Sequence, residues 1–470
     1  MRTFNFCLFL LLVFFVQCKT KEIKSAKKTA KPNIIIILTD DQGYGDVGFN
    51  GNKQLKTPNL DQLAKNGVIF TNGYASYAVC GPSRAGLITG RYQDRFGYSR
   101  NPLFAPKDPI IGLPLTEETL AEALKKAGYT NMAIGKWHLG ANSIYRPLKR
   151  GFDEFFGFLS GGHKYFPEQL VLNNISEVTS QFDAYNTKLL RNNTRIEEKE
   201  YLTDAFSREA VNFVKKNADK PFFLYLAYNA PHAPLQATEK YLSRYKHIEN
   251  KDRKTYNAMV SAVDDGVGLL LDKLKTLGIE ENTIVFFLSD NGGNKSKGAY
   301  NGALRGGKGS LFEGGVRVPF AMQWKGTVPP NQKYEHPIIA LDIFATAISQ
   351  AKVTPKNSID GKNLIPYLTK ENKEAPHEEL FWRMYDKNLF AVIKGEAKLH
   401  KNISGKTGLY NLKNDISEKK LLKDSILSKK LRELYKAWNA KNKAPIFDGL
   451  LKDKDYNIKH PDRYKNVEKY

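Results

Sequence analysis

Four apolar runs of the sequence share one pattern, because each ends abruptly in polar residues with charged or reactive side chains. The runs are rich in β-branched and aromatic residues, which is typical of strands buried on both faces of a sheet. In an open α/β sheet, ligands bind beyond the carboxyl ends of the strands, so we expect the four polar clusters to meet at one site. The runs are residues 33–39 before Asp40 and Asp41, 129–135 before Lys136, Trp137 and His138, 221–228 before His232, and 283–289 before Asp290 and Asn291.

Helical patterns separate these apolar runs. We interpret Thr116-Glu117-Glu118-Thr119 as a helix cap with acidic residues in the first turn, and Gly128 closes the same helix. The alternation of strands and helices predicts a doubly wound α/β sandwich. The expected helices are residues 59–66, 116–126, 203–216 and 256–276.

After about residue 375 the pattern changes to short strands at hairpin spacing, followed by one helix, which predicts a small antiparallel sheet beside the main domain. The expected strands are residues 380–384, 390–393, 397–400 and 408–412, and the expected helix is 426–438. We divide the chain into an export signal at 1–18, a tether at 19–31, a main domain at 32–375 and a C-terminal subdomain at 376–470.

The N-terminus has the features of an export signal. Arg2 precedes an apolar stretch at residues 7–16, which is too short to span a bilayer as a helix. Cys18 ends this stretch, as in lipoprotein signals, although Gln17 departs from the usual small residue. We expect lipidation of Cys18 and an enzyme or binding protein held at a bacterial membrane, in the periplasm or at the cell surface. An ordinary signal peptide and an uncleaved anchor are the alternatives.

The chain is strongly basic, with 72 lysine and arginine residues against 49 aspartate and glutamate residues and a formal net charge of +23. Such an excess attracts polyanions. Nucleic acid is a poor candidate, because no helix-turn-helix, zinc-finger or ribonucleoprotein motif occurs and the protein is expected to be exported. A sulfated polysaccharide fits better, while biased composition with solvated lysines is the alternative explanation.

Asp40, Asp41 and Asp290 are expected to face one another, which is unfavourable unless a cation lies between them. At an effective dielectric constant near 20, a like-charge pair at about 4 Å costs about 4 kcal/mol. Oxygen ligands, including the amide of Asn291, favour a hard cation, so we expect Ca²⁺ with Mg²⁺ as the alternative. Asp40-Asp41 and Asp290-Asn291, each taken alone, are also typical of turns.

Basic side chains follow the strands in the same way. Lys136 and His138 lie in a loop bounded by glycines, and His232 lies between prolines. Lys308 lies in a glycine-rich loop that allows an anion to approach closely, although the spacing of a Walker motif is not met. Each segment alone is also compatible with an ordinary loop.

Cys80 begins the run Cys80-Gly81-Pro82-Ser83-Arg84, which is followed by Thr89-Gly90-Arg91. Pro82 suits the first position of a helix, so we expect Cys80 just before a helix N-terminus, where free amides favour an anion. Arg84 adds a permanent positive charge. Without this context, a single cysteine is most often a small buried apolar residue.

The Cys-x-Pro-Ser-Arg and Thr-Gly-Arg segments resemble the signature of the type I sulfatases, and Gly-Lys-Trp-His-Leu-Gly at residues 135–140 resembles the second signature of that family. The resemblance spans about residues 32–415. It implies an alkaline-phosphatase-like α/β fold, in which a large mixed sheet is flanked by helices and a smaller C-terminal antiparallel sheet carries one helix. It also implies that a maturation enzyme converts Cys80 to formylglycine.

The resemblance further implies a role for each candidate residue. Calcium would be bound by Asp40, Asp41, Asp290, Asn291 and the modified Cys80. Arg84, Lys136 and Lys308 would hold the sulfate group, and one hydroxyl of the hydrated aldehyde would attack sulfur as Asp290 takes its proton. His138 would assist the release of sulfate, and His232, with Lys308, would assist the leaving alcohol.

The expected activity is hydrolysis of sulfate esters on a sulfated polysaccharide or oligosaccharide, without a diffusible organic cofactor. We expect residues 160–167 and the insert at 168–201 to shape the pocket rim, with His163 as a substrate contact. One alternative is a phosphonate or phosphate monoester hydrolase on the same scaffold. Another is a sulfated-glycan-binding protein without activity, which requires that Cys80 stays unmodified.

Overall fold

The computed structural model describes residues 31–465 and 467. The expected export signal with Cys18 and nearly all of the expected tether lie outside these residues. Within the described part, none of the helices combines the length and the apolar character that a membrane span requires.

Within residues 31–465, ten strands form one mixed central sheet in the order β11-β2-β10-β9-β1-β8-β4-β5-β6-β7. The five middle strands, from β9 to β5, run parallel, and β10 and β6 flank them in the antiparallel direction. The strands are β1 (Asn33–Thr39), β2 (Val68–Phe70), β4 (Thr130–Lys136), β5 (Glu154–Phe158), β6 (Leu189–Arg191), β7 (Thr194–Ile196), β8 (Phe222–Ala227), β9 (Thr283–Ser289), β10 (Phe320–Gln323) and β11 (Gln332–Tyr334).

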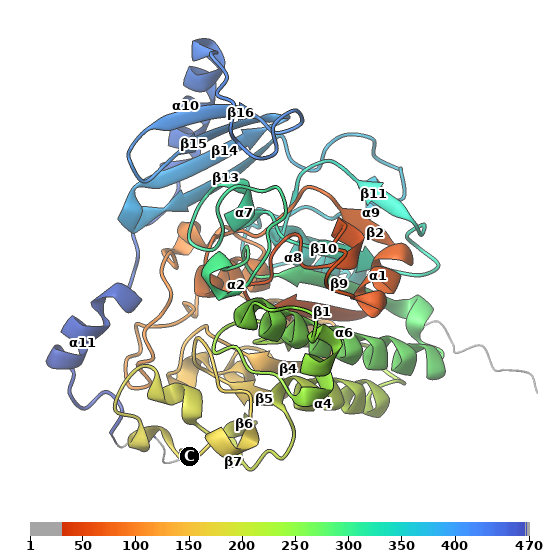
Figure 1. Ribbon diagram of the computed structural model, residues 1–470, viewed down its shortest axis with the longest axis vertical. Coiled ribbons are helices and arrows are strands. Elements are labelled where there is room, and N and C mark those ends of the chain that lie inside the picture. Colours follow the sequence, from red (N-terminus) through yellow and green to blue (C-terminus); the bar gives the residue numbers. More distant parts are fainter. Residues whose placement is uncertain (1–30, 466, 468–470) are drawn as a thin grey trace, which may run out of the picture.

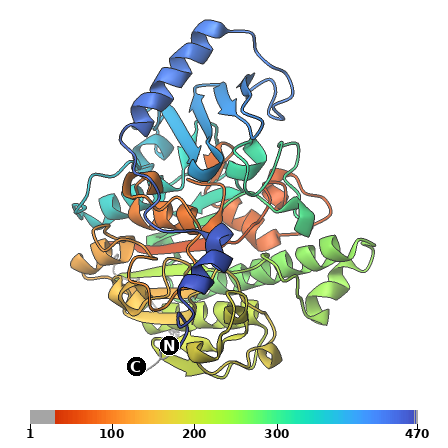
Figure 2. The same ribbon diagram turned by 90° about the vertical axis from the view of Figure 1, so that its left-hand side faces the viewer.

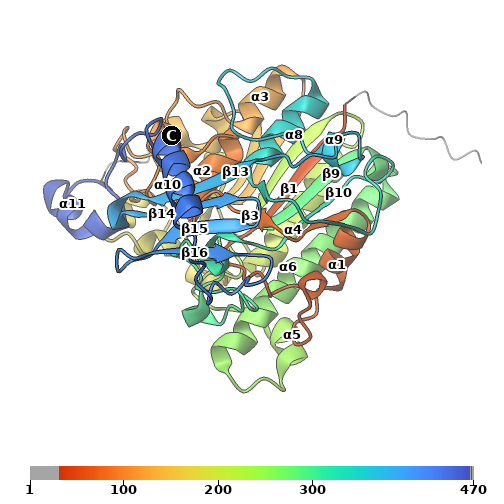
Figure 3. The same cartoon turned by 90° about the horizontal axis from the view of Figure 1, so that it is seen from above.

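Helices cover both faces of this sheet, because alternate residues of its buried strands point to opposite sides. Ile34 and Ile36 of β1 pack with α2, α3 and α8 on one face, whereas Ile35 and Ile37 pack with α1, α4 and α6 on the other. The two layers are visible in Figure 3. The helices are α1 (Pro58–Lys65), α2 (Cys80–Thr89), α3 (Leu120–Lys126), α4 (Leu202–Lys216), α6 (Lys251–Thr276) and α8 (Leu341–Ala351).

The described C-terminal residues form a four-stranded antiparallel sheet with one helix across it (Figure 1). Tyr435 of the helix stacks on Phe390 of the sheet, with ring centroids 4.3 Å apart. The chain then passes down beside the main domain through a further short helix, drawn in dark blue in Figure 2. The elements are β13 (Glu379–Met384), β14 (Leu389–Lys394), β15 (Ala397–Lys401), β16 (Thr407–Asn411), α10 (Ser425–Asn439) and α11 (Asp453–Lys459).

Shorter elements complete the described fold. A two-stranded parallel sheet joins β3 to β12, and three helices of a single turn lie in connecting segments. They are β3 (Gly73–Tyr74), β12 (Ile338–Ile339), α5 (Glu239–Leu242), α7 (Glu313–Val316) and α9 (Ile365–Leu368). The fold class expected from the sequence is confirmed.

The expected start of the helix at residues 116–126 is wrong by four residues. Helix α3 begins at Leu120, because Thr119 and Glu122 form a reciprocal capping box. The hydroxyl of Thr119 accepts from the Glu122 amide at 3.1 Å, and the Thr119 amide donates to the Glu122 carboxylate at 2.8 Å. Helix α6 begins at Lys251, earlier than expected, because the side chain of Asn250 caps it.

Candidate active site

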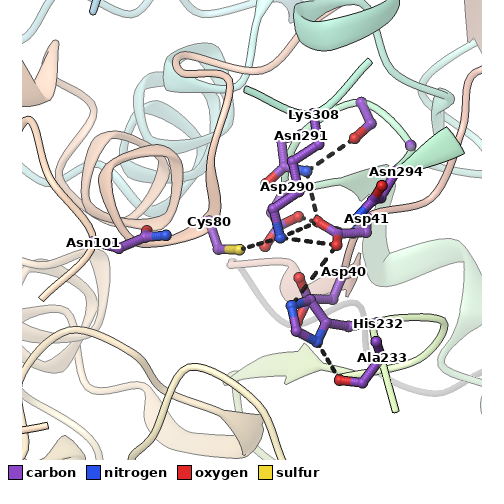
Figure 4. Close-up of polar contacts among 12 residues, drawn as sticks. Asp40, Asp41, Cys80, Asn101, His232, Ala233, Asp290, Asn291, Asn294 and Lys308 are labelled. Carbon is purple, nitrogen blue, oxygen red and sulfur yellow. Dashed lines mark hydrogen bonds and ion pairs between the residues drawn. The ribbon is translucent and has the colours of Figure 1, made fainter. Parts of the chain in front are cut away.

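The polar residues at the ends of four parallel strands meet at the carboxyl edge of the central sheet, and Figure 4 shows those that follow β1, β8 and β9. Asp40 and Asp41 follow β1, Lys136 ends β4, His232 follows β8 and Asp290 follows β9. Strand β1 lies between β8 and β9, so the sheet order itself brings these side chains together.

Three buried carboxylates of this cluster each contact a basic side chain. All of the carboxylates, with Arg84 and Lys136, are less than 5% exposed, whereas the Lys308 side chain is 19% exposed. Charges buried this deeply require partners of opposite sign. The ion pairs are Lys136 Nζ to Asp40 Oδ2 at 2.6 Å, Arg84 Nε to Asp290 Oδ2 at 2.9 Å, and Lys308 Nζ to Asp41 at 2.8 Å.

Cys80 lies inside the first turn of α2, not just before it as expected, and Val79 is the N-cap residue. Pro82 therefore takes the third helical position, which is tolerated because the first amides of a helix have no intrahelical acceptor. The Cys80 Sγ atom lies 3.4 Å from Lys308 Nζ. Burial raises the pKa of the thiol to about 12 even though Lys136 and Lys308 oppose the shift, so the unmodified side chain is a protonated thiol near pH 7.

Two site residues adopt left-handed backbone conformations, with φ of 64° at Asp41 and 57° at His138. Such conformations are uncommon outside glycine and persist where neighbouring groups fix them. The Asp41 amide donates to Asp290 Oδ1 at 3.3 Å, and the phenol of Tyr98 donates to the His138 carbonyl at 3.2 Å. The fold therefore holds both residues in place.

Several oxygens of the cluster suit a divalent cation. Asp40 Oδ1 and Asn291 Oδ1 are buried and have no hydrogen-bond partner among the described residues. One donor atom from each of Asp40, Asp41, Cys80 and His232 lies within 4.8 Å of the others. A hard cation such as calcium would satisfy the orphaned oxygens, so the residues present fit the expected metal.

The ligand set from the sequence only partly coincides with this group. The structure adds His232 to the group, a residue that the sequence placed at the same site but assigned to the leaving alcohol and not to the metal. Asp290 is adjacent, but its oxygens contact Arg84 and the Asp41 amide. Asn291 donates through Nδ2 to Asp41 Oδ1 at 2.8 Å, which leaves its carbonyl oxygen available.

Both site histidines are neutral near pH 7. Burial, then Lys136 and Arg84, hold the pKa of His138 well below its usual value, and burial with Lys308 lowers the pKa of His232 to about 3. The His232 Nδ1 atom lies 2.6 Å from the carbonyl of Ala233, and Nε2 lies 3.7 Å from Asp41 Oδ2. His232 thus donates through Nδ1 and turns the lone pair of Nε2 toward the site.

The contacts of His163 lie outside this cluster. Its side chain is buried, its ring lies 4.6 Å from that of Phe158, and Nδ1 is 3.0 Å from the carbonyl of Lys164. Its role as a substrate contact stays a prediction.

Two tyrosines near the site were not singled out from the sequence. The buried phenol of Tyr225, on β8, lies beside Arg84, and burial raises its pKa to about 12. Tyr185, in the insert at residues 168–201, packs against Gly162 and interacts electrostatically with Cys80. A tyrosine in a buried strand or in a polar insert has no local pattern that reveals such a position.

Comparisons with known proteins agree with this arrangement. A family model described as Sulfatase matches residues 32–353, and one described as N-sulphoglucosamine sulphohydrolase, C-terminal, matches 307–443. Human N-acetylgalactosamine-6-sulfatase is 36% identical over 387 residues, which cover 78% of this chain and 71% of the human protein.

Solved structures extend these similarities. The crystal structure of Ps i-CgsB in complex with k-i-k-neocarrahexaose has a TM-score of 0.85 and 40% identity, and the match covers 93% of this chain and 98% of that one. The phosphonate monoester hydrolase of Agrobacterium radiobacter has a TM-score of 0.64 at 20% identity, covering 91% and 97% of the two chains. That similarity shows a shared fold alone.

Proposed function

Because this chain belongs to the sulfatase family and is a sulfate ester hydrolase, we propose that its substrate is a sulfated polysaccharide or oligosaccharide and that it acts through a formylglycine made from Cys80 and a bound calcium ion. The observation that carries this proposal is the position of Cys80. Its sulfur is buried beside Lys308 and within the cluster of paired acids and bases that follows the four strands.

Cys80 as a thiol is unsuited to the reaction. Burial raises its pKa to about 12, so the thiolate is scarce at neutral pH. Conversion to formylglycine would provide an aldehyde whose hydrate offers a hydroxyl as the nucleophile toward sulfur. The position of Cys80 in the first turn of α2 places that group at the positive end of the helix dipole, which favours negative charge.

We propose Asp40, Asp41, Asp290, Asn291 and the modified residue 80 as calcium ligands, with His232 adjacent. When bound, the ion would lower the pKa of the nucleophile and balance negative charge on the sulfate group. The unpartnered oxygens of Asp40 and Asn291 support this assignment.

The basic side chains then serve the anionic group of the substrate. Arg84 is fixed by Asp290 and also donates through Nη1 to the carbonyl of Lys136 at 2.9 Å, so its guanidinium is preorganised. Lys136 and Lys308 bring two further positive charges into a buried site, where they strongly stabilise negative charge that develops in the transition state.

Proton transfer is assigned to acids and histidines of the same cluster. Burial and the neighbouring Asp40 raise the pKa of Asp290 to about 6, which suits a group that accepts the proton of the nucleophile near neutral pH. The neutral His138 would take a proton during the release of sulfate. His232, together with the positive charge of Lys308, would assist the departure of the leaving alcohol.

A sulfated glycan is supported by the relatives and by charge. One similar structure was solved with k-i-k-neocarrahexaose, and a human relative is an N-acetylgalactosamine-6-sulfatase. The formal charge of +23 favours the approach of a polyanion.

We further propose that the protein is exported and attached to a bacterial membrane through a lipid on Cys18. The apolar stretch at residues 7–16 and the cysteine that ends it support this location. A Cys18→Ala variant should move from the membrane fraction to the soluble exported fraction, and retention of the variant in membranes would contradict the lipid anchor.

Two measurements on protein from its native host test the enzymatic proposal. Peptide mass across Cys80 should show formylglycine, and a panel of sulfated oligosaccharides that includes k-i-k-neocarrahexaose should release inorganic sulfate, read by linkage-resolved NMR. The Cys80→Ala variant is the matched control and should fold but release none. An unmodified thiol in active protein, activity confined to aromatic sulfates, or faster turnover of a phosphonate ester with the same leaving group would contradict the proposal.

A further inference from the structure

The orientation of the His232 ring depends on the backbone of its own loop. The ring bonds through Nδ1 to the carbonyl of Ala233 at 2.6 Å, a contact drawn in Figure 4. Ala233 is the next residue of the chain, so the peptide group between His232 and Ala233 sets the position of this acceptor. Whatever fixes that peptide group therefore also fixes the direction in which the Nε2 lone pair points.

The phenol of Tyr165 lies against this peptide group. Its single hydrogen is shared between the carbonyls of Asn229 and His232, each 2.7 Å from the phenol oxygen. The Asn229 carbonyl also accepts from the His232 amide at 2.8 Å. Tyr165 is completely buried, so its hydroxyl holds the two ends of the turn together at a position that solvent does not reach.

Tyr165 is itself anchored outside the loop of His232. Its carbonyl accepts at 2.9 Å from the amide of Leu202, the first residue of α4. Its ring stacks on that of Tyr201, with centroids 5.9 Å apart. Helix α4 packs on the central sheet, and Tyr165 thus ties the turn at His232 to the rigid part of the main domain.

Tyr201 makes a corresponding contact further along the same loop. Its phenol donates to the carbonyl of Gln236 at 2.8 Å, and its side chain is also buried. Two stacked tyrosines therefore each donate to the backbone of this loop. Of the two, Tyr165 alone contacts the peptide group that follows His232.

We propose that Tyr165 is a positioning residue for His232, because its hydroxyl fixes the peptide group after His232 and so turns Nε2 toward the active site. The catalytic consequence rests on the proposed function, in which His232 assists the departure of the leaving alcohol. The His232 side chain is 17% exposed, which leaves the ring room to turn once the peptide group is released. Displacement of a catalytic group by about 1 Å can lower a rate about 10²-fold.

The test compares Tyr165→Phe with Tyr201→Phe, which is the matched control. Each variant keeps its stacked ring and loses one buried phenol that donates to the loop, so similar losses of stability are expected in urea. The substrate is the glycan of the panel above that releases sulfate fastest. Tyr165→Phe should lower kcat by about 10–100-fold with little change in KM, whereas Tyr201→Phe should leave kcat within about twofold of wild type.

The same substitution in a His232→Gln background separates positioning from general support of the loop. There, Tyr165→Phe should lower kcat by less than about twofold, because the group that it positions is absent. Equal losses in the two backgrounds would overturn this inference. An equal loss of kcat in Tyr201→Phe would overturn it too, since that variant leaves the peptide group after His232 untouched.

A crystal structure of Tyr165→Phe gives a readout that does not depend on activity. The peptide group after His232 should turn, and Nε2 should move away from its position 3.7 Å from Asp41 Oδ2. An unchanged ring would overturn the positioning role whatever the activity. If wild type released no sulfate from any glycan, the proposed function would fail, while a displaced ring in the variant would still support the role of Tyr165.

Discussion

The ammonium nitrogen of Lys308 lies 2.8 Å from both carboxylate oxygens of Asp41. Lys136 and Arg84 contact Asp40 and Asp290 in the same way, so positive and negative charges in this described cluster balance without a metal ion. Lys308 differs from the other two bases, because its side chain is partly exposed and also contacts the sulfur of Cys80. It is therefore the basic group best placed to exchange a carboxylate for an incoming anion.

Removal of metal should abolish activity but leave the protein folded. Treatment with EDTA should lower sulfate release at least 100-fold, whereas the thermal unfolding midpoint should fall by only a few degrees, because the basic residues already neutralise the acids. A ligand present at 100 times its Kd adds about 2.7 kcal/mol to the free energy of unfolding. Added calcium should restore the activity. Calorimetry that showed unfolding on chelation would contradict this account of the apo site.

Lys308 and Lys136 should respond differently to replacement by methionine. Lys308→Met should lower kcat by about 10²–10³-fold, the usual effect of removing a group that stabilises the transition state. Its effect on stability should be the smaller of the two, because water reaches that side chain. Lys136→Met should lower kcat and also cost about 3–5 kcal/mol in the unfolding free energy of the calcium-free protein, because it leaves Asp40 buried with only Arg84, at 3.8 Å, as a counter-charge.

Urea unfolding and sulfate release, measured on both variants, check this contrast. Equal losses of stability would show that exposure does not distinguish the two lysines.

The central sheet could be predicted closely from the sequence because its strands are buried on both faces. Continuous apolar runs leave few alternatives to a buried strand. Strands β1 and β9 therefore match their expected bounds, and β4 and β8 differ from theirs by one residue at each end. The meeting of Asp40 with Asp290 follows from the same logic, since each residue directly follows one of two neighbouring parallel strands.

Helix starts were less predictable, because they depend on which of several polar residues makes the capping hydrogen bond. Thr116 and Thr119 both suit the role, and the reciprocal bond with Glu122 selects Thr119. Contacts between distant segments were not predictable where they involve residues outside the strand ends. The approach of Tyr185 to Cys80, and the pairing of Lys398 with Glu313, join residues whose local sequences contain no sign of the partner.

A buried ionic group joins the C-terminal sheet to the loop that carries Lys308. Lys398 on β15 lies 2.7 Å from Glu313 and 3.0 Å from Glu418, and all three side chains are inaccessible to solvent. The amide of Glu313 donates to Glu418 at 2.6 Å, and Arg305 donates to the carbonyl of Glu418 at 2.8 Å. The segment from Arg305 to Glu313 is thereby held at both ends.

Lys398→Met should therefore destabilise the protein by about 3–5 kcal/mol, because it leaves two buried carboxylates without their common partner. The matched control is Lys413→Met, which removes an exposed pair with Glu396 and should cost at most about 1 kcal/mol. Urea unfolding of both variants measures the difference, and similar costs would argue against the buried group as a structural link.

Asp264 should make stability depend on pH. This residue of α6 is buried, and its carboxylate accepts from the amide of Leu60 at 2.8 Å and the side chain of Asn59 at 3.0 Å, at the start of α1. Burial raises its pKa from 3.8 to about 6 despite these hydrogen bonds. The folded protein thus binds this proton more tightly than the unfolded chain, and the resulting stability is complete below pH 4 and is lost as pH rises through 6. The shift corresponds to about 3 kcal/mol.

The unfolding free energy of wild type minus that of Asp264→Asn should therefore increase by up to about 3 kcal/mol between pH 7 and pH 4, measured in urea. Asp272→Asn, at an exposed position of the same helix, is the matched control. A difference for Asp264→Asn that stays constant with pH would show that burial does not hold this proton.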